Sequence, residues 1–182
     1  MHTKFRSLAG LGAIGMLMAV GTGISHAQET INSNGWYKAC SDQGENKICN
    51  VQYQAVASTG QVITSINLAE ITGSLQKRVF QVTVPTGRMI PQGMKVKIGE
   101  AEEKTVPFSF CTPQICAAEQ DLTDDIVAQL KASGEMKLMS VNWQGKENPL
   151  SVPLEGFTEA FDGEPIAQQV PAGRSAHRQR LP

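Results

Sequence analysis

Histidine is scarce in this chain of 182 amino acids, where it occurs only as His2, His26 and His177. The first two lie in a segment that we expect to be removed, and the third lies among polar and basic residues near the end. Serine and cysteine nucleophiles paired with histidine, histidine general bases, and the usual catalytic zinc or copper sites all need an imidazole on a folded scaffold. The sequence therefore argues against the common hydrolase and metalloenzyme classes, and we expect no catalytic residue, no metal site and no cofactor.

A concentrated basic face is also lacking. Lys4 and Arg6 leave with the first 27 residues, so that 16 basic side chains become 14 against 17 acidic ones. The remaining lysines and arginines are scattered, apart from three arginines between residues 174 and 180. Because a protein that binds a polyanion normally presents a basic patch, we expect no nucleic-acid partner.

Long apolar runs are confined to the N-terminal segment. Residues 1–7 are basic, residues 8–20 are apolar and glycine-rich, and residues 25–27 end in Ala27, which are the three parts of a secretory signal peptide. We expect cleavage after Ala27. No later stretch approaches the length of a bilayer span, and no cysteine at the cleavage site can carry a lipid. The sequence thus predicts a soluble protein of the periplasm without an integral membrane span, and leaves outer-membrane association or secretion open.

The mature chain has the length of one domain. Removing 27 residues from 182 leaves 155, which is enough to bury a core. The apolar pattern is lost from about residue 167, where a run with Pro171, Gly173 and arginines begins. We expect a single β-rich domain over residues 28–166 and a flexible basic C-terminal tail over residues 167–182.

Apolar and polar residues alternate along much of the chain. The pattern is clearest over residues 51–55 and Met94–Ile98, and it is typical of strands that bury one face. Further strands are expected over residues 36–40, 62–71, 78–84, 104–110, 135–143 and 150–154. Turn residues separate them, including Thr59-Gly60 and Gln144-Gly145. The rhythm predicts a mainly β fold, an antiparallel β-sandwich or partly closed barrel.

One segment has helical spacing instead. Leu122, Ile126, Val127 and Leu130 recur at three to four residues, which predicts a covering helix over residues 123–132. Either Asp121 or Thr123 can cap its start, and Gly134 lies just beyond its end. A second short helical turn would place Phe157 and Phe161 on one face, where we expect them to close the core.

The four cysteines form two close pairs in the sequence, Cys40 with Cys49 and Cys111 with Cys116. Three pairings are possible, and we favour the local one in an oxidising compartment. The first pair flanks the polar, turn-like residues 41–48, as expected for a bridge across a hairpin base. A four-cysteine zinc site or a thioredoxin-type redox centre normally shows C-x-x-C spacing, which is absent.

The densest carboxylate group consists of Glu119, Asp121, Asp124 and Asp125. Carboxylates interact favourably with the positive end of a helix, so we interpret this group as an ordinary helix start. Its spacing does not fit a calcium loop. A carboxylate pair of the kind that glycosidases use is assembled across a fold and leaves no local motif, so this alternative stays open.

The best candidate for a contact site is the loop of residues 85–93. It carries Arg88, Met89 and Ile90, a cation beside two large apolar side chains where exposure is expected. Met89 or Ile90 folding back onto the sheet is an equally acceptable reading. Trp36 and Trp143 are each potential surface anchors, but a tryptophan in a strand pattern is more often buried, which is our expectation for both.

These motifs together resemble the invasion-associated locus B family of secreted bacterial proteins. The resemblance spans most of the mature chain and rests on the following features: Trp36 with Cys40 and Cys49; Pro85-x-Gly87 and Pro91-x-Gly93 leading into Met94–Ile98; Phe110-Cys111 with Cys116-Ala117-Ala118; and Leu154-Glu155-Gly156-Phe157 with Ala160. Thr86 and Arg88 are more polar than the family pattern. The resemblance implies a β-rich envelope protein linked to host-cell invasion, with no catalytic residues to carry over.

Three functional hypotheses follow. The first is an exported, non-enzymatic envelope protein that acts through contacts with an envelope or host protein. The second is a periplasmic accessory or chaperone-like protein, and the third is a carboxylate-based hydrolase of cell-wall glycans. A cleft that holds two facing carboxylates would distinguish the third. The oligomeric state is left open, because exposed strand edges permit dimers without requiring them.

Overall fold

The computed structural model describes residues 31–33 and 35–166, with side chains from residue 35 onward. The expected leader over residues 1–27 and the expected tail over residues 167–182 lie outside the described residues. The three histidines lie outside them as well.

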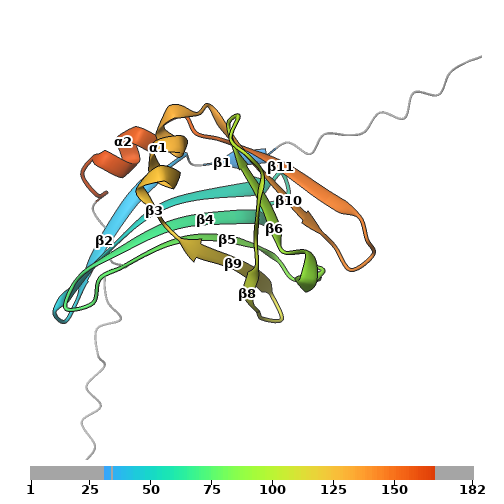
Figure 1. Ribbon diagram of the computed structural model, residues 1–182, viewed down its shortest axis with the longest axis horizontal. Coiled ribbons are helices and arrows are strands. Elements are labelled where there is room, and N and C mark those ends of the chain that lie inside the picture. Colours follow the sequence, from blue (N-terminus) through green and yellow to red (C-terminus); the bar gives the residue numbers. More distant parts are fainter. Residues whose placement is uncertain (1–30, 34, 167–182) are drawn as a thin grey trace, which may run out of the picture.

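Two antiparallel sheets make up the body of the protein (Figure 1). The large sheet has the strand order β1-β3-β4-β5-β9-β8, with β2 paired to the part of β3 that β1 does not cover. The small sheet has the order β11-β10-β6-β7. The strands of the large sheet are β1 (Ile31–Ser33), β2 (Tyr37–Gln43), β3 (Asn46–Ala57), β4 (Val62–Gly73), β5 (Lys77–Pro85), β8 (Phe108–Cys111) and β9 (Ile115–Asp121). Those of the small sheet are β6 (Met94–Ile98), β7 (Lys104–Val106), β10 (Glu135–Val141) and β11 (Glu147–Pro153).

The two sheets enclose one apolar core. Alternate residues of the long strands point inward, such as Val51 and Tyr53 in β3 and Phe80 and Val82 in β5, and all four are buried. The small sheet contributes Met136 and other residues to the same cluster. The alternation therefore predicted the buried face correctly, and the fold is a two-sheet sandwich rather than a closed barrel.

The predicted strand over residues 104–110 is in fact two strands in different sheets. β7 ends at Val106 and pairs with β6, whereas β8 begins at Phe108 and pairs with β9. Pro107 lies between them and has no amide hydrogen to donate to a strand ladder. The chain crosses from one sheet to the other at this residue.

The first hairpin also differs from the prediction. Residues 41–48 were expected to form a polar turn, but β2 and β3 continue through them to a tight turn around Gly44, whose φ of 61° suits glycine. Pairing within the ladder satisfies the backbone here even though the side chains are polar. Strand β9 was not predicted at all, because its sequence ICAAEQD has no run of β-branched or aromatic residues.

The two helices lie where the spacing predicts them. α1 (Asp124–Ala132) begins after Thr123, whose hydroxyl accepts a hydrogen bond from the Ile126 amide at 3.3 Å. α2 (Phe157–Asp162) buries Phe157, whose ring centroid lies 5.6 Å from that of Phe161. Figure 1 shows both helices on the convex side of the arched large sheet.

Both disulfides join directly opposite residues of a hairpin. Cys40 pairs with Cys49 between β2 and β3, and Cys111 pairs with Cys116 between β8 and β9. The S–S distances are 2.06 and 2.09 Å. The local pairing that we favoured is therefore confirmed.

Candidate contact surface

The loop of residues 85–93 is fixed by backbone hydrogen bonds to the β10–β11 hairpin. The Met89 amide donates to the carbonyl of Val141 at 2.8 Å, and the Trp143 amide donates to the carbonyl of Gly87 at 2.9 Å. A short 3₁₀ turn, η1 (Ile90–Gln92), follows. The loop thus presents its side chains from a defined backbone.

The three predicted contact residues differ in their surroundings. The Arg88 guanidinium is half-buried and donates from Nε to the carbonyl of Pro85 at 3.1 Å. Burial lowers the pKa of Arg88 from its usual value, but an arginine stays charged at neutral pH. Met89 is half-buried, whereas Ile90 is 54% exposed. Of these three side chains, Ile90 is therefore the one most available to a partner.

Trp143 extends this surface and corrects one of our expectations. It was expected to be buried at the end of a strand, but β10 ends at Val141 and Trp143 lies in the turn that follows, 73% exposed. Its ring lies against the loop, because a Cβ atom built on Gly87 would stand 3.4 Å from Trp143 Cδ1. Trp36, by contrast, is 9% exposed, as expected. The turn residues around Trp143, Asn142 and Gly145, were the signal for this exposure.

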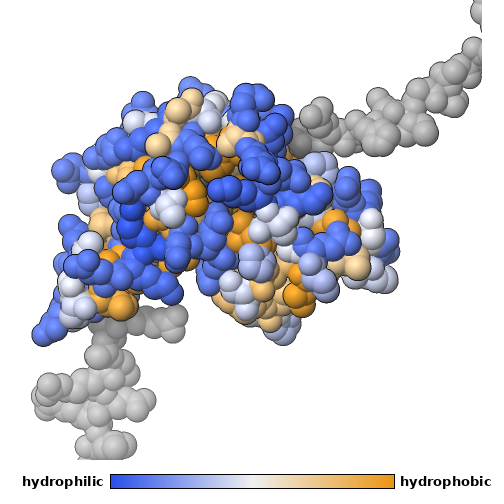
Figure 2. Space-filling view, in the orientation of Figure 1, coloured by the Kyte–Doolittle hydropathy of each residue, from blue (hydrophilic) through white to orange (hydrophobic). Residues whose placement is uncertain are grey.

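Further apolar side chains are exposed at the same end of the sandwich. The Thr86 amide donates to the carbonyl of Gln114, which brings the β8–β9 hairpin beside the loop. Val62 and Ile115 line a hollow of about 150 Å³ together with Pro85. We call this surface the apolar end; its exposed large apolar residues are Val62, Ile90, Phe110, Ile115 and Trp143. Figure 2 shows apolar residues gathered near η1 and the β8–β9 hairpin at the lower edge of the molecule.

Among the described residues, the apolar end carries few charged side chains. Its connecting segments are residues 58–61, 86–93, 112–114 and 142–146, and their charged residues are Arg88 and Lys146. The exposed Glu147, the first residue of β11, follows Lys146 directly and pairs with Val141. Carboxylates gather at the opposite end of the strands, in the segments of residues 99–103 and 121–125. β9 runs from one end to the other over the seven residues Ile115–Asp121, which separates the two groups by about 20 Å. This is more than two Debye lengths at physiological salt, so these carboxylates, unlike Glu147, are largely screened from a partner at the apolar end.

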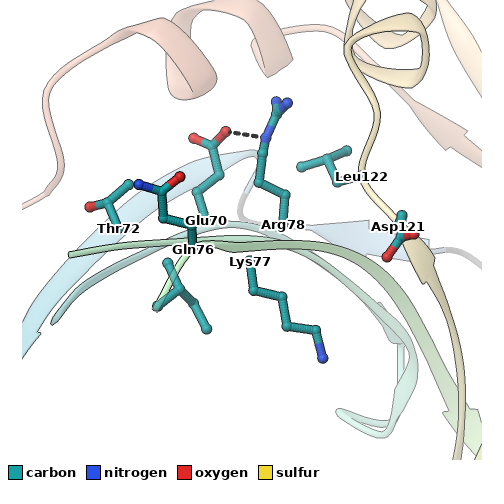
Figure 3. Close-up of a pocket in the computed structure, with 8 residues that line it drawn as sticks. Glu70, Thr72, Gln76, Lys77, Arg78, Asp121 and Leu122 are labelled. Atoms are coloured by element: carbon teal, nitrogen blue, oxygen red, sulfur yellow. Dashed lines mark hydrogen bonds and ion pairs between the residues drawn. The ribbon is translucent and has the colours of Figure 1, made fainter. Parts of the chain in front are cut away.

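A polar hollow of about 490 Å³ lies at that opposite end, near the start of β5 (Figure 3). It contains two carboxylates, Glu70 and Asp121. Glu70 accepts a hydrogen bond from Arg78 Nε at 2.9 Å, while Figure 3 shows Asp121 on the other side of the sheet, pointing away from Glu70. This hollow therefore lacks the facing carboxylates that the hydrolase hypothesis needs.

The acidic cluster that we noted in the sequence lies at the start of α1. Asp124 and Asp125 occupy the first turn of the helix, as predicted. Asp124 also accepts a hydrogen bond from Arg78 at 2.6 Å, and together with Glu70 it raises the pKa of Arg78, most strongly through that bond. Glu119 instead accepts a hydrogen bond from Gln81 on the outer face of the large sheet.

The fold and these surfaces define the class of the molecule as a small two-sheet β-sandwich with a disulfide in each of two hairpins and an exposed apolar end. In the part of the chain that the structure describes, no helix has the length and apolar character of a membrane span. The chain belongs to the invasion associated locus B (IalB) protein family, whose model matches residues 36–165.

Relatives that are named as invasion proteins B support this assignment. An invasion protein B homolog of Brucella abortus (strain 2308) is 27% identical over 160 residues, which cover 87% of this chain and 89% of the relative. A homolog from Brucella abortus biovar 1 (strain 9-941) gives the same values. The crystal structure of invasion associated protein b from Bartonella henselae matches with a TM-score of 0.59 at 23% identity, covering 72% of this chain and 92% of that one. This last match concerns the fold alone.

Proposed function

We propose that this chain is an exported, non-enzymatic protein of the cell envelope, which acts through contact with another protein of the envelope or of a host cell. The observation that carries the proposal is the apolar end, where Trp143 and Ile90 are both exposed on neighbouring segments that also carry Arg88, Lys146 and Glu147. Binding energy at protein interfaces is concentrated on a few aromatic and arginine side chains, and Trp143 is of this kind.

Export is the second part of the proposal. Two disulfides suit an oxidising compartment, and the N-terminal residues have the composition of a secretory signal. We propose the periplasm as the location, with association with the outer membrane or release from the cell as further steps. Cell fractionation tests this: recovery of the full-length chain with reduced cysteines in the cytoplasm would contradict it.

Site-specific photocrosslinking in intact cells tests the contact. Benzoylphenylalanine is introduced in place of Ile90, in place of Trp143, and, as a matched control, in place of Leu75, which is 52% exposed near the opposite end. We expect positions 90 and 143 to form the same discrete protein adduct and position 75 not to form it. If positions 90 and 143 gave only lipid adducts, or no adduct, the proposed protein contact would be wrong.

The same surface supports a second candidate, a chaperone-like role in envelope maintenance. Exposed tryptophan, isoleucine and phenylalanine suit an unfolded client as well as a folded partner. In this case the purified protein suppresses the aggregation of unfolded outer-membrane proteins, measured by light scattering, and the double variant Ile90→Ser, Trp143→Ser loses that effect. A cell-wall glycan hydrolase is less well supported, and turnover of a glycan by the purified protein would contradict the non-enzymatic proposal.

A further inference from the structure

The outer face of the large sheet carries a continuous row of planar polar side chains. Each member is the direct cross-strand partner of the next. In order across the sheet they are Tyr37 (β2), Gln52 (β3), Asn67 (β4), Gln81 (β5) and Glu119 (β9). Their neighbours along each strand point into the core, so all five lie on the face away from it. We call this set the amide row.

The row crosses five neighbouring strands at right angles. Adjacent strands are about 4.8 Å apart, so the row is roughly 19 Å long. Figure 1 shows α1 and α2 on the other side of the sheet, and no helix among the described residues covers this side. The row is thus an extended feature of the concave face, and each of its five members is partly exposed.

Side-chain hydrogen bonds hold parts of the row in place. The Tyr37 hydroxyl donates to Gln52 Oε1 at 2.7 Å, and Gln81 Nε2 donates to Glu119 Oε1. Asn67 lies in the middle, and its Oδ1 has no hydrogen-bond partner among the described residues. An acceptor that is buried but unpaired costs free energy, and a rotation of the Asn67 side chain toward a bound donor would remove that cost.

No aromatic or basic side chain of the described strands lies directly beside the row. The neighbours on one side are Gln54, Ser65, Thr83 and Ala117, and those on the other are Ala39, Asn50, Ala69, Val79 and Asp121. The neighbours of Asn67 and Gln81 at the centre, such as Ser65 and Ala69, are short, so an extended ligand can lie along the row there.

The outer face of the small sheet shows how an ordinary solvated face of this protein looks. It carries three lysines, and each forms an ion pair with a nearby glutamate: Lys95 with Glu103, Lys97 with Glu100, and Lys137 with Glu135. The amide row uses no such pairs, and Glu119 is its one charged member. The two faces therefore differ in kind, and the row is not simply the polar side of an amphipathic sheet.

We propose that the amide row is a binding site for a neutral oligosaccharide. A primary amide both donates and accepts hydrogen bonds, as does each hydroxyl of a sugar, and three amides in register repeat this match along a chain of sugar rings. The charged side chains in and beside the row, Glu119 and Asp121, are both negative, which disfavours polyanions. A protein partner is disfavoured too, because Tyr37 is the one aromatic side chain of the row and the other four members are amides and a carboxylate, in contrast to the apolar end. This site is independent of the proposed protein contact and uses a different face.

The experiment is an NMR titration of the mature protein with the tetramer of N-acetylglucosamine, with tetramers of glucose and mannose as further neutral probes and a sulfated heparin tetrasaccharide as the charged one. We expect a neutral tetramer at millimolar concentration to shift the side-chain amide signals of Gln52, Asn67 and Gln81. The heparin fragment should not shift them.

Two variants separate binding from folding. Gln52→Ala combined with Gln81→Ala should weaken binding at least tenfold, while Gln144→Ala, the same chemical change at an exposed position of the apolar end, should leave it unchanged. Thermal unfolding by circular dichroism verifies that the double variant is folded, and if it is not, the single variants Gln52→Ala and Gln81→Ala take its place. The proposal is overturned if no neutral tetramer shifts these signals, if the heparin fragment binds more tightly, or if folded variants bind as well as the original chain.

Discussion

Phe157 is the residue on which the packing of α2 depends. Its side chain is fully buried, and its ring lies 5.0 Å from Trp36 and 5.6 Å from Phe161. Phe157→Ala removes these contacts and leaves a cavity, so we expect the free energy of unfolding to fall by about 3–5 kcal/mol. Urea unfolding followed by circular dichroism measures it. Phe161→Ala, at a partly buried position, should cost less, and equal losses would contradict the packing described here.

Ser151 controls the ionisation of Glu135 on the outer face of the small sheet. The hydrogen bond from its hydroxyl, together with the bond from Lys137, lowers the pKa of Glu135 below its ordinary value. Because the folded state favours the ionised form, this group stabilises the fold above its unfolded pKa, and that contribution is lost as the pH falls through the folded pKa. Ser151→Ala should raise the pKa of Glu135 in an NMR titration. Ser74→Ala, in the turn between β4 and β5, should not, and an unchanged pKa in the Ser151 variant would refute the assignment.

Several of these residues could be placed from the sequence and others could not. Thr123 and Phe157 were predictable because a helix cap and a four-residue spacing are local signals. Trp143 was placed wrongly, because the apolar pattern of β10 continues into the turn that ends the strand, and periodicity alone does not show where a strand stops.

At the scale of secondary-structure elements, the two disulfides stabilise hairpins of different length. The cysteines are 9 residues apart in the β2–β3 hairpin and 5 apart in the β8–β9 hairpin. By the loop-entropy model, removal should cost about 2.5 kcal/mol for the first and about 2 kcal/mol for the second.

Paired substitutions measure these costs in urea. Cys40→Ser with Cys49→Ser removes the first bridge. Because Cys116 is buried, Cys111→Ser with Cys116→Ala removes the second. Loss of stability well under 1 kcal/mol in both cases would show that neither bridge constrains the unfolded chain.

The elements that sequence analysis missed share a physical cause. Neither β9 nor the polar part of the β2–β3 hairpin has side chains typical of a strand. Both are strands because a neighbouring strand supplies backbone hydrogen-bond partners. The exchange of sheets at Pro107 was marked by the proline itself, which should have divided the predicted strand.

At the scale of the whole molecule, both candidate surfaces depend on long-range pairing. The alternation in residues 51–55 placed Gln52 on an outer face, but only the register of five strands aligns it with Asn67 and Glu119. Likewise, the apolar end brings together four connections that are far apart in the sequence. Register is set by the complete fold, so the sequence predicted the loop of Arg88, Met89 and Ile90 but neither surface as a unit.

The two tryptophans differ in burial: Trp36 belongs to the core, whereas Trp143 is exposed at the apolar end. Substitution of each by alanine should therefore have different effects on stability. Trp36 packs between β3 and α2, with rings 5.2 Å from Tyr53 and 5.0 Å from Phe157, and its indole nitrogen donates to the carbonyl of Pro153 in β11 at 2.9 Å. It therefore links the large sheet to the small one. Trp36→Ala should lower the free energy of unfolding by about 3–5 kcal/mol.

Trp143→Ala should change that free energy by no more than about 0.5 kcal/mol, because the side chain is mostly in water. It should also remove most of the fluorescence that acrylamide quenches in the folded chain, since the remaining tryptophan, Trp36, is buried. Urea unfolding and quenching measure the two effects on the same samples. If Trp143→Ala destabilised the protein as much as Trp36→Ala, Trp143 would be part of the core, and the apolar end would lose the side chain on which the proposed contact depends.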